Sequence, residues 1–171
     1  MAGSKAPLVV VVMGVSGSGK TEVGRLVAAE LGCEFLDADD FHPPENVERM
    51  RRGIPLDDEQ RGPWLDRLAG IVTDAGAAGR RIVLACSALK RRYRERMGVG
   101  QPHVRLVHLD GPEALIRDRL AGRVGHYMPA SLLASQCAAL ERPAADEGAI
   151  TVSIAGSPAS IARNITAALA D

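Results

Sequence analysis

The chain has few aromatic residues and no excess of charge of either sign. Its 171 residues include one Trp, two Tyr and two Phe, and 21 Lys and Arg balance 21 Asp and Glu. Proteins that bind nucleic acids present basic surfaces, and those that bind single strands also stack bases on aromatic side chains. The composition therefore argues against a nucleic-acid partner and predicts a core of Val, Leu, Ile and Ala.

Cysteines and long apolar runs are also scarce. Cys33, Cys86 and Cys137 stand far apart with no C-x-x-C pair, which argues against a disulfide framework or a zinc site. The apolar run at 8–13 is too short for a signal peptide, and no stretch has the ~20 apolar residues of a membrane span. We expect a cytoplasmic protein that makes no contact with a membrane.

One octapeptide carries most of the functional information. Residues 14–21 read G-V-S-G-S-G-K-T, which fits the phosphate-binding loop (P-loop) in full. The glycines allow backbone N–H groups to approach phosphate oxygens closely. Lys20 supplies a cation for the β- and γ-phosphates, and the Thr21 hydroxyl suits Mg²⁺. The predicted ATP-binding residues of the loop are Gly14, Val15, Ser16, Gly17, Ser18, Gly19, Lys20 and Thr21.

The flanking sequence supports this interpretation of the loop. Residues 8–13 form the continuous apolar run of a strand buried on both faces. After the loop, apolar residues recur at helical spacing, at Val23, Leu26, Val27 and Leu31. The loop is therefore expected at a helix N-terminus, whose partial positive charge favours phosphate.

Strand and helix patterns alternate along the rest of the chain. Further strands are predicted at 34–36, 82–86, 104–109 and 150–154, and helices at 43–52, from Pro63, from Pro112 and from Pro158 with Ser157 as N-cap. This alternation predicts one α/β domain over 1–171, a five-stranded parallel sheet between two helical layers. Residues 121–135, with Gly122, Gly125 and Pro129, are expected to form a mobile lid.

Two carboxylates follow the second predicted strand. Asp37 and Asp39 are spaced i, i+2, so on an extended segment they face the same side, and ligands bind off the carboxyl ends of such strands. We expect Asp37 to hold Mg²⁺ through water, and Asp39 to bind the substrate and accept a proton from its attacking hydroxyl. The alternative is that Asp39 or Asp40 merely caps the next turn.

Other polar residues are candidates for contacts with the substrates. Arg61 can bind a substrate carboxylate in a bidentate manner, with Arg49 a weaker candidate, whereas His42 is expected to shape a turn. Ser87 and Lys90 follow the third strand, and Arg91, Arg92 and Arg96 are expected on a solvated helix face. Arg119 and Arg123, one helical turn apart, are expected to close over the γ-phosphate, unless Arg119 only pairs with Asp118 or Glu113. The predicted substrate-binding residues are Asp39, Arg49, Arg61, Ser87, Lys90 and His126.

Taken in order, these segments resemble the gluconate kinases. The resemblance covers about residues 8–147 and rests on Gly14–Thr21, Phe35-Leu36-Asp37-x-Asp39, His42-Pro43, Asn46, Pro55-Leu56, Arg61, Pro63-Trp64-Leu65, Cys86-Ser87-Ala88-Leu89-Lys90, Tyr93-Arg94 and Arg123-x-Gly125-His126. It implies a nucleoside-monophosphate-kinase-like fold, the substrates ATP and D-gluconate, the product 6-phospho-D-gluconate and often a homodimer. By position, Lys20, Asp39 and Arg123 are then the catalytic residues, and Arg119, Arg123 and His126 belong to the lid.

Two alternatives remain at this stage. A kinase for another small sugar acid or polyol, such as shikimate, would have the same length and fold, although the segment 86–90 argues against shikimate. A nucleotide-switched regulatory protein would usually carry a guanine-specific Asn-Lys-x-Asp motif, which this sequence lacks.

Overall fold

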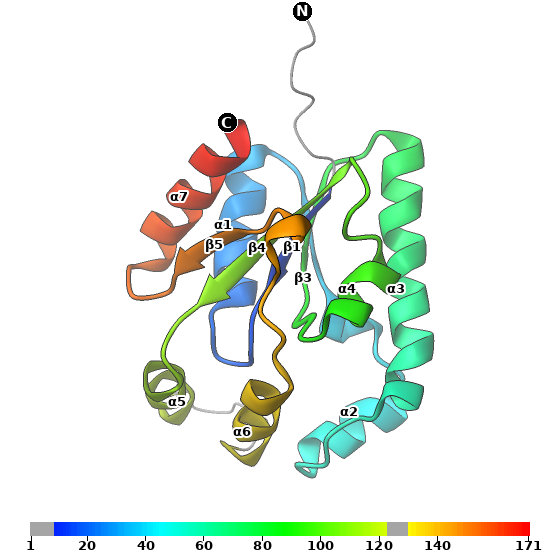
Figure 1. The fold of residues 1–171 in the computed structure, drawn as a ribbon, viewed down its shortest axis with the longest axis vertical. Helices are drawn as coiled ribbons and strands as arrows, with labels where there is room; N and C mark the ends of the chain where they lie inside the picture. Colours follow the sequence, from blue (N-terminus) through cyan, green and yellow to red (C-terminus); the bar gives the residue numbers. More distant parts are fainter. Residues whose placement is uncertain (1–8, 123–129) are drawn as a thin grey trace, which may run out of the picture.

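A five-stranded sheet forms the centre of the computed structural model, which describes residues 9–122 and 130–171 (Figure 1). The neighbours in the sheet run β2-β3-β1-β4-β5, and every pair is parallel. The predicted five-stranded parallel sheet is thus confirmed. The strands are β1 (Val9–Met13), β2 (Glu34–Asp37), β3 (Ile82–Ala85), β4 (Val104–Asp110) and β5 (Ile150–Ser153).

The central strand β1 is fully buried and contributes to two cores. Successive side chains of a strand point to opposite faces of the sheet. Val9, Val11 and Met13 belong to the core on one face, and Val10 and Val12 belong to the core on the other. This explains why residues 9–13 are uniformly apolar rather than alternating.

Helices cover both faces of the sheet (Figure 1). On one face lie α1 (Lys20–Leu31) and α7 (Pro158–Ala170), and on the other α3 (Asp58–Ala78) and α4 (Arg91–Met97). Three more helices lie beyond the carboxyl ends of the strands, where the loops that follow the strands gather. They are α2 (Pro44–Arg51), α5 (Glu113–Ala121) and α6 (Ala130–Ala139), and two short 3₁₀ turns span η1 (Ala38–Phe41) and η2 (Ala145–Glu147).

Helix α3 begins earlier than predicted. Asp57 caps it by accepting a hydrogen bond from the Gln60 backbone N–H at 2.8 Å, and the Gln60 side chain accepts one from the Asp57 N–H at 3.0 Å. This reciprocal capping box starts the helix at Asp58. The predicted start at Pro63 was therefore wrong: Pro63 lies inside the helix, and Arg61 lies in its first turn.

At the other end of the chain, the predicted cap of the last helix is confirmed, because the Ser157 hydroxyl accepts from the Ser160 N–H with Pro158 in the first turn.

Residues 123–129 of the predicted lid lie outside the described residues, and 130–135 belong to α6. Across the ranges 9–122 and 130–171, no helix is both long and apolar enough to cross a bilayer.

Candidate active site

The P-loop connects β1 to α1 through backbone conformations that favour glycine. Gly19, the N-cap of α1, has φ 93°, and Gly17 has φ 82°. A Cβ on Gly17 would also lie 2.7 Å from Leu120 Cγ of α5. A side chain at position 17 would therefore strain the loop backbone and force Leu120 to shift. The loop leads directly into α1, so the backbone N–H groups of the first turn of α1 adjoin it.

One buried hydroxyl in the loop fits a ligand-binding role. Ser18 Oγ is inaccessible to solvent and has no hydrogen-bond partner within the described part of the chain. A buried polar group without a partner costs free energy, which a bound ligand can recover. The orphan hydroxyl, beside backbone N–H groups and Lys20, fits the binding of a phosphate oxygen.

Lys20, Thr21 and Asp37 meet at the start of α1. Lys20 Nζ donates to the Val15 carbonyl oxygen at 3.1 Å, and Thr21 Oγ1 donates to Asp37 Oδ2 at 2.8 Å. Asp37 Oδ1 accepts from the Asp39 backbone N–H at 3.0 Å, so Asp37 also caps η1. The capping role considered for Asp39 or Asp40 at this turn thus falls to Asp37.

The oxygen pair of Thr21 and Asp37 fits a magnesium ion. Mg²⁺ prefers oxygen ligands and usually combines one or two protein groups with water and substrate phosphates. Among the residues that the structure describes, no cluster of three or more His, Cys, Asp or Glu could hold a metal by itself. Any magnesium here would need ligands from water and from the nucleotide.

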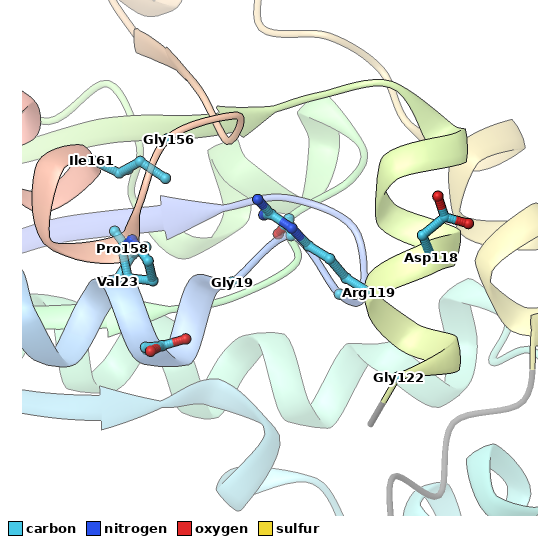
Figure 2. Close-up of a pocket in the computed structure, with 11 residues that line it drawn as sticks. Gly19, Val23, Asp118, Arg119, Gly122, Gly156, Pro158 and Ile161 are labelled. Atoms are coloured by element: carbon cyan, nitrogen blue, oxygen red, sulfur yellow. The ribbon is translucent and has the colours of Figure 1, made fainter. Parts of the chain in front are cut away.

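A cavity of about 340 Å³ opens on the α5 side of the P-loop (Figure 2). We call it the Arg119 cavity, because Arg119 extends across it from α5 (Figure 2). Arg119 Nη2 donates to the Ile154 carbonyl oxygen at 2.6 Å, while Glu113 pairs with Arg117 at 2.6 Å instead. The walls of the cavity come from the P-loop, α1, α5 with its C-cap, and the first turn of α7 with the residue Gly156 before it. The lining residues are Gly17, Ser18, Gly19, Glu22, Val23, Asp118, Arg119, Gly122, Gly156, Pro158 and Ile161.

A second cavity opens on the other side of the P-loop, and we call it the Asp39 cavity. It unites side chains from segments that lie far apart in the sequence: two P-loop residues, a carboxylate that follows β2, the Arg61 guanidinium of α3 and the Ser87 hydroxyl that follows β3. Its lining residues are Ser16, Lys20, Asp39, His42, Met50, Leu56, Arg61, Trp64, Ser87, Leu89 and Gln136.

The electrostatics of this cavity centre on Asp39. Its side chain keeps 54% of its surface exposed, yet surrounding atoms displace much of the bulk water. This desolvation raises the pKa of Asp39, the Lys20 ammonium lowers it, and the carboxylates of Asp37 and Asp40 raise it further. Asp39 therefore holds its proton more tightly than an ordinary aspartate, which suits a general base.

Arg61 is held firmly at the wall of the same cavity. Its Nη1 donates to the Leu56 carbonyl oxygen at 2.5 Å and to the Tyr93 hydroxyl at 3.2 Å. The guanidinium carbon also lies 5.3 Å from the centroid of the Tyr93 ring. An arginine fixed in this way offers a pre-oriented cation to a carboxylate ligand.

Two predicted substrate residues that the structure describes, Arg49 and Lys90, do not line this cavity. Arg49 is exposed on α2, whereas the next residue, Met50, lines the cavity. Lys90 is the N-cap of α4, and its Nζ lies 5.8 Å from the Tyr93 ring centroid. Arg123 and His126 lie outside the described residues.

Several contributors were missed from the sequence. Gln136 Oε1 accepts from the backbone N–H of Ser16 at 2.7 Å, so α6 contacts the P-loop directly. Trp64 Nε1 donates to the Ala38 carbonyl oxygen at 2.7 Å and thereby supports the turn that carries Asp39. Trp64 occurs in a recognisable Pro-Trp-Leu segment, whereas no local pattern indicates Gln136.

Arg94 is another residue whose role was missed. Its side chain is completely buried, forms an ion pair with Glu147, and donates to the carbonyl oxygens of Ala88 and Leu89 at 2.9 and 3.2 Å. Ala88 has φ 46°, an unusual value for a residue other than glycine. Arg94 thus stabilises the strained segment that presents Ser87 and Leu89 to the Asp39 cavity.

Comparison with known proteins agrees with this geometry. A family model described as an AAA domain matches residues 9–143. The thermosensitive gluconokinase of Escherichia coli is 48% identical over 137 residues, which cover 80% of this chain and 73% of that protein. The crystal structure of a gluconokinase from Sinorhizobium meliloti matches with a TM-score of 0.87 and 41% identity, over 96% of this chain and 93% of that one.

A shikimate kinase from Acinetobacter baumannii is more distant, with 24% identity and a TM-score of 0.61 over 97% of this chain and 96% of that one. That likeness shows a common fold only. The nucleoside-monophosphate-kinase-like fold expected from the sequence is confirmed, and the P-loop, the two cavities and the high identity all lead to one family. The chain belongs to the gluconokinase family of ATP-using P-loop kinases.

Proposed function

We propose that the chain transfers the γ-phosphoryl group of ATP to the terminal hydroxyl of D-gluconate and releases ADP and 6-phospho-D-gluconate. The observation that carries this proposal is the Asp39 cavity, where Ser16 and Lys20 of the P-loop share one space with Asp39 and Arg61. A phosphate donor gripped by the loop and an acid acceptor held by Arg61 would meet there.

The nucleotide is proposed to bind along the P-loop. Backbone N–H groups of the loop, the Ser18 hydroxyl and Lys20 would hold the phosphates, and the Arg119 cavity would take the rest of the nucleotide. Thr21 and Asp37 would hold Mg²⁺, which in such sites neutralises charge on the phosphates. Arg119 would contact the nucleotide from this cavity, and the predicted lid residue Arg123 would add positive charge next to the γ-phosphate.

Gluconate is proposed to bind with its two ends recognised differently. Arg61 would hold the carboxylate, Ser87 would bind a hydroxyl, and the terminal hydroxyl would lie against Asp39. As the new O–P bond forms, Asp39 takes the hydroxyl proton, and the bond between the γ-phosphorus and the bridging oxygen breaks to release ADP. Catalysis would then come mainly from positioning and from charge neutralisation.

The remaining predicted contacts of this reaction are part of the same proposal. Arg49 and Lys90 would act only if α2 and the start of α4 move toward the substrate, and His126, which lies outside the described residues, stays a predicted substrate contact. Cytoplasmic location is supported by Cys33, Cys86 and Cys137, all of which are free thiols. A homodimer, expected from the family resemblance, remains a prediction that sedimentation of the purified protein would test.

A coupled assay of ADP formation with a panel of sugar acids tests the proposal. The wild-type protein should use gluconate with Mg²⁺ and ATP, and it should use shikimate and neutral glucose poorly. Arg61→Ala should raise the KM for gluconate and leave the slow reaction with glucose unchanged, since glucose has no carboxylate. Activity that is equal with every acceptor, or absent with gluconate, would contradict the proposal.

A further inference from the structure

His42 forms a rigid part of the wall of the Asp39 cavity. Only 4% of its side chain is exposed, and its ring stacks on Trp64 with centroids 4.1 Å apart and planes inclined by 15°. Buried polar groups are normally satisfied by hydrogen bonds. A histidine fixed between a tryptophan and a substrate cavity therefore has a defined orientation toward any ligand that enters.

Asn46 determines which ring nitrogen of His42 carries the proton. Asn46 Nδ2 donates to the Gln60 carbonyl oxygen at 3.1 Å, a bond that only the amide nitrogen can make. The same nitrogen lies 3.3 Å from His42 Nδ1, so Nδ1 is the acceptor there. The hydrogen of the neutral ring must then reside on Nε2.

The Nε2–H group lies next to Asp39. The two atoms, His42 Nε2 and Asp39 Oδ1, are 3.9 Å apart, which is too far for a direct hydrogen bond. An oxygen atom placed to one side can lie about 2.8 Å from both atoms at once. A hydroxyl group there would donate to the carboxylate and accept from the imidazole.

The charges around the ring agree with this arrangement. Desolvation and the nearby Arg61 guanidinium lower the pKa of His42 to about 4. The ring is therefore neutral at neutral pH, and Nε2–H remains a donor without adding a third cation to a cavity that already contains Lys20 and Arg61.

We propose that His42 contacts the sugar acid directly and donates Nε2–H to the hydroxyl oxygen that Asp39 engages, with Asn46 as the positioning residue that fixes the tautomer. This inference rests on the proposed function of the site. It assigns specificity to the pair: Asp39 and His42 together recognise a group that is both donor and acceptor, which a hydroxyl is and an amine in its charged form is not.

Two variants of His42 distinguish the effect of its N–H donor from the effect of its aromatic ring. His42→Phe keeps an aromatic ring to stack on Trp64 but has no N–H, and His42→Gln restores an N–H donor. We expect His42→Phe to lower kcat/KM for gluconate about 5- to 150-fold, the loss expected for one unmade hydrogen bond. The KM for ATP should stay within about twofold, and His42→Gln should recover a substantial part of the loss.

Asn46→Asp tests the tautomer itself. In the neutral ring, a carboxylate at position 46 would accept a hydrogen bond from Nδ1–H and leave Nε2 as an acceptor facing the Asp39 carboxylate. Because a second carboxylate also raises the pKa of the imidazole, this variant is assayed at alkaline pH, where the ring is neutral. We expect a loss in kcat/KM for gluconate comparable to that of His42→Phe although the imidazole is intact. His103→Gln, at a histidine in the groove between α3 and α4, is the control and should match the wild type.

The outcomes distinguish this inference from the proposed function. If the wild type phosphorylates gluconate but His42→Phe keeps kcat/KM within twofold, the inference is overturned and the function stands. If His42→Phe and His42→Gln lower kcat/KM for gluconate equally and both also raise the KM for ATP, the role of His42 is purely structural, and the inference is again overturned. If His42→Phe fails to fold, His42→Gln and Asn46→Asp decide the question by the same kinetic comparison.

Discussion

Replacing Arg94 by methionine should be among the most damaging single substitutions outside the substrate cavities. Arg94 Nε and Nη2 donate to the two carboxylate oxygens of Glu147 at 2.6 and 3.0 Å. The side chains of Arg94 and Glu147 are only 0% and 6% exposed. Arg94→Met leaves a buried carboxylate without its cation and leaves the Ala88 and Leu89 carbonyl oxygens without this donor.

Breaking a buried ion pair from one side costs about 3–5 kcal/mol. Domains of this kind are stable by about 5–15 kcal/mol, so the loss is a large fraction of the total. Urea unfolding at pH 7 measures it directly. The double variant Arg94→Met, Glu147→Gln should recover at least ~1 kcal/mol, because the uncompensated charge is gone.

The pH dependence gives an independent check. The Arg94 guanidinium lowers the pKa of Glu147 below its ordinary value of 4.5. The stabilisation by this pair is therefore complete above pH 4.5 and is lost as the pH falls through the lower pKa of the folded state. The stability difference between wild type and Glu147→Gln should shrink over that range. A cost below about 1 kcal/mol for Arg94→Met, or a double variant no more stable than the single one, would refute this reasoning.

Three further predictions concern the catalytic loop and the general base. Lys20→Ala should abolish turnover, since the loop loses its phosphate-binding ammonium; near wild-type rates in the coupled assay would contradict its assignment. Asp39→Asn should lower kcat about 10²- to 10⁴-fold. Because desolvation raises the pKa of Asp39 above 3.8, wild-type kcat/KM should rise with pH through that raised value, and the variant should lack this limb. Gly17→Ala should weaken ATP binding in calorimetry, since its Cβ would lie 2.7 Å from Leu120, whereas Gly32→Ala, with a similar positive φ and nothing within 4 Å, should not.

Local sequence signals were sufficient to predict the part of the site that β1, the P-loop and α1 form. The apolar run, the glycine-rich octapeptide and the helical spacing after Lys20 are contiguous, so β1, the P-loop and α1 follow from neighbouring residues. The same holds for the helix cap at Ser157. At Pro63 the prediction failed because it relied on a proline typical of a first turn and missed the Asp57-x-x-Gln60 capping box, which starts the helix five residues earlier, at Asp58.

Contacts between distant segments could not be predicted in this way. Gln136 and the Ser16 N–H that it accepts from are 120 positions apart, and no periodicity links them. The basic run after Lys90 shows the same limit. Arg91, Arg92 and Arg96 form exposed ion pairs, as a solvated face should, but Arg94 turns inward, where only the folded position of Glu147 explains a buried guanidinium.

The central claim is that the P-loop and the Asp39 cavity cooperate to move a phosphoryl group onto a sugar acid rather than onto water. Phosphorus NMR of a mixture of protein, ATP, Mg²⁺ and gluconate measures this directly. We predict one phosphomonoester signal that splits by coupling to the protons of a terminal carbon, grows with ADP and requires gluconate. Inorganic phosphate as the main product, or ADP formation that is independent of gluconate, would contradict the claim.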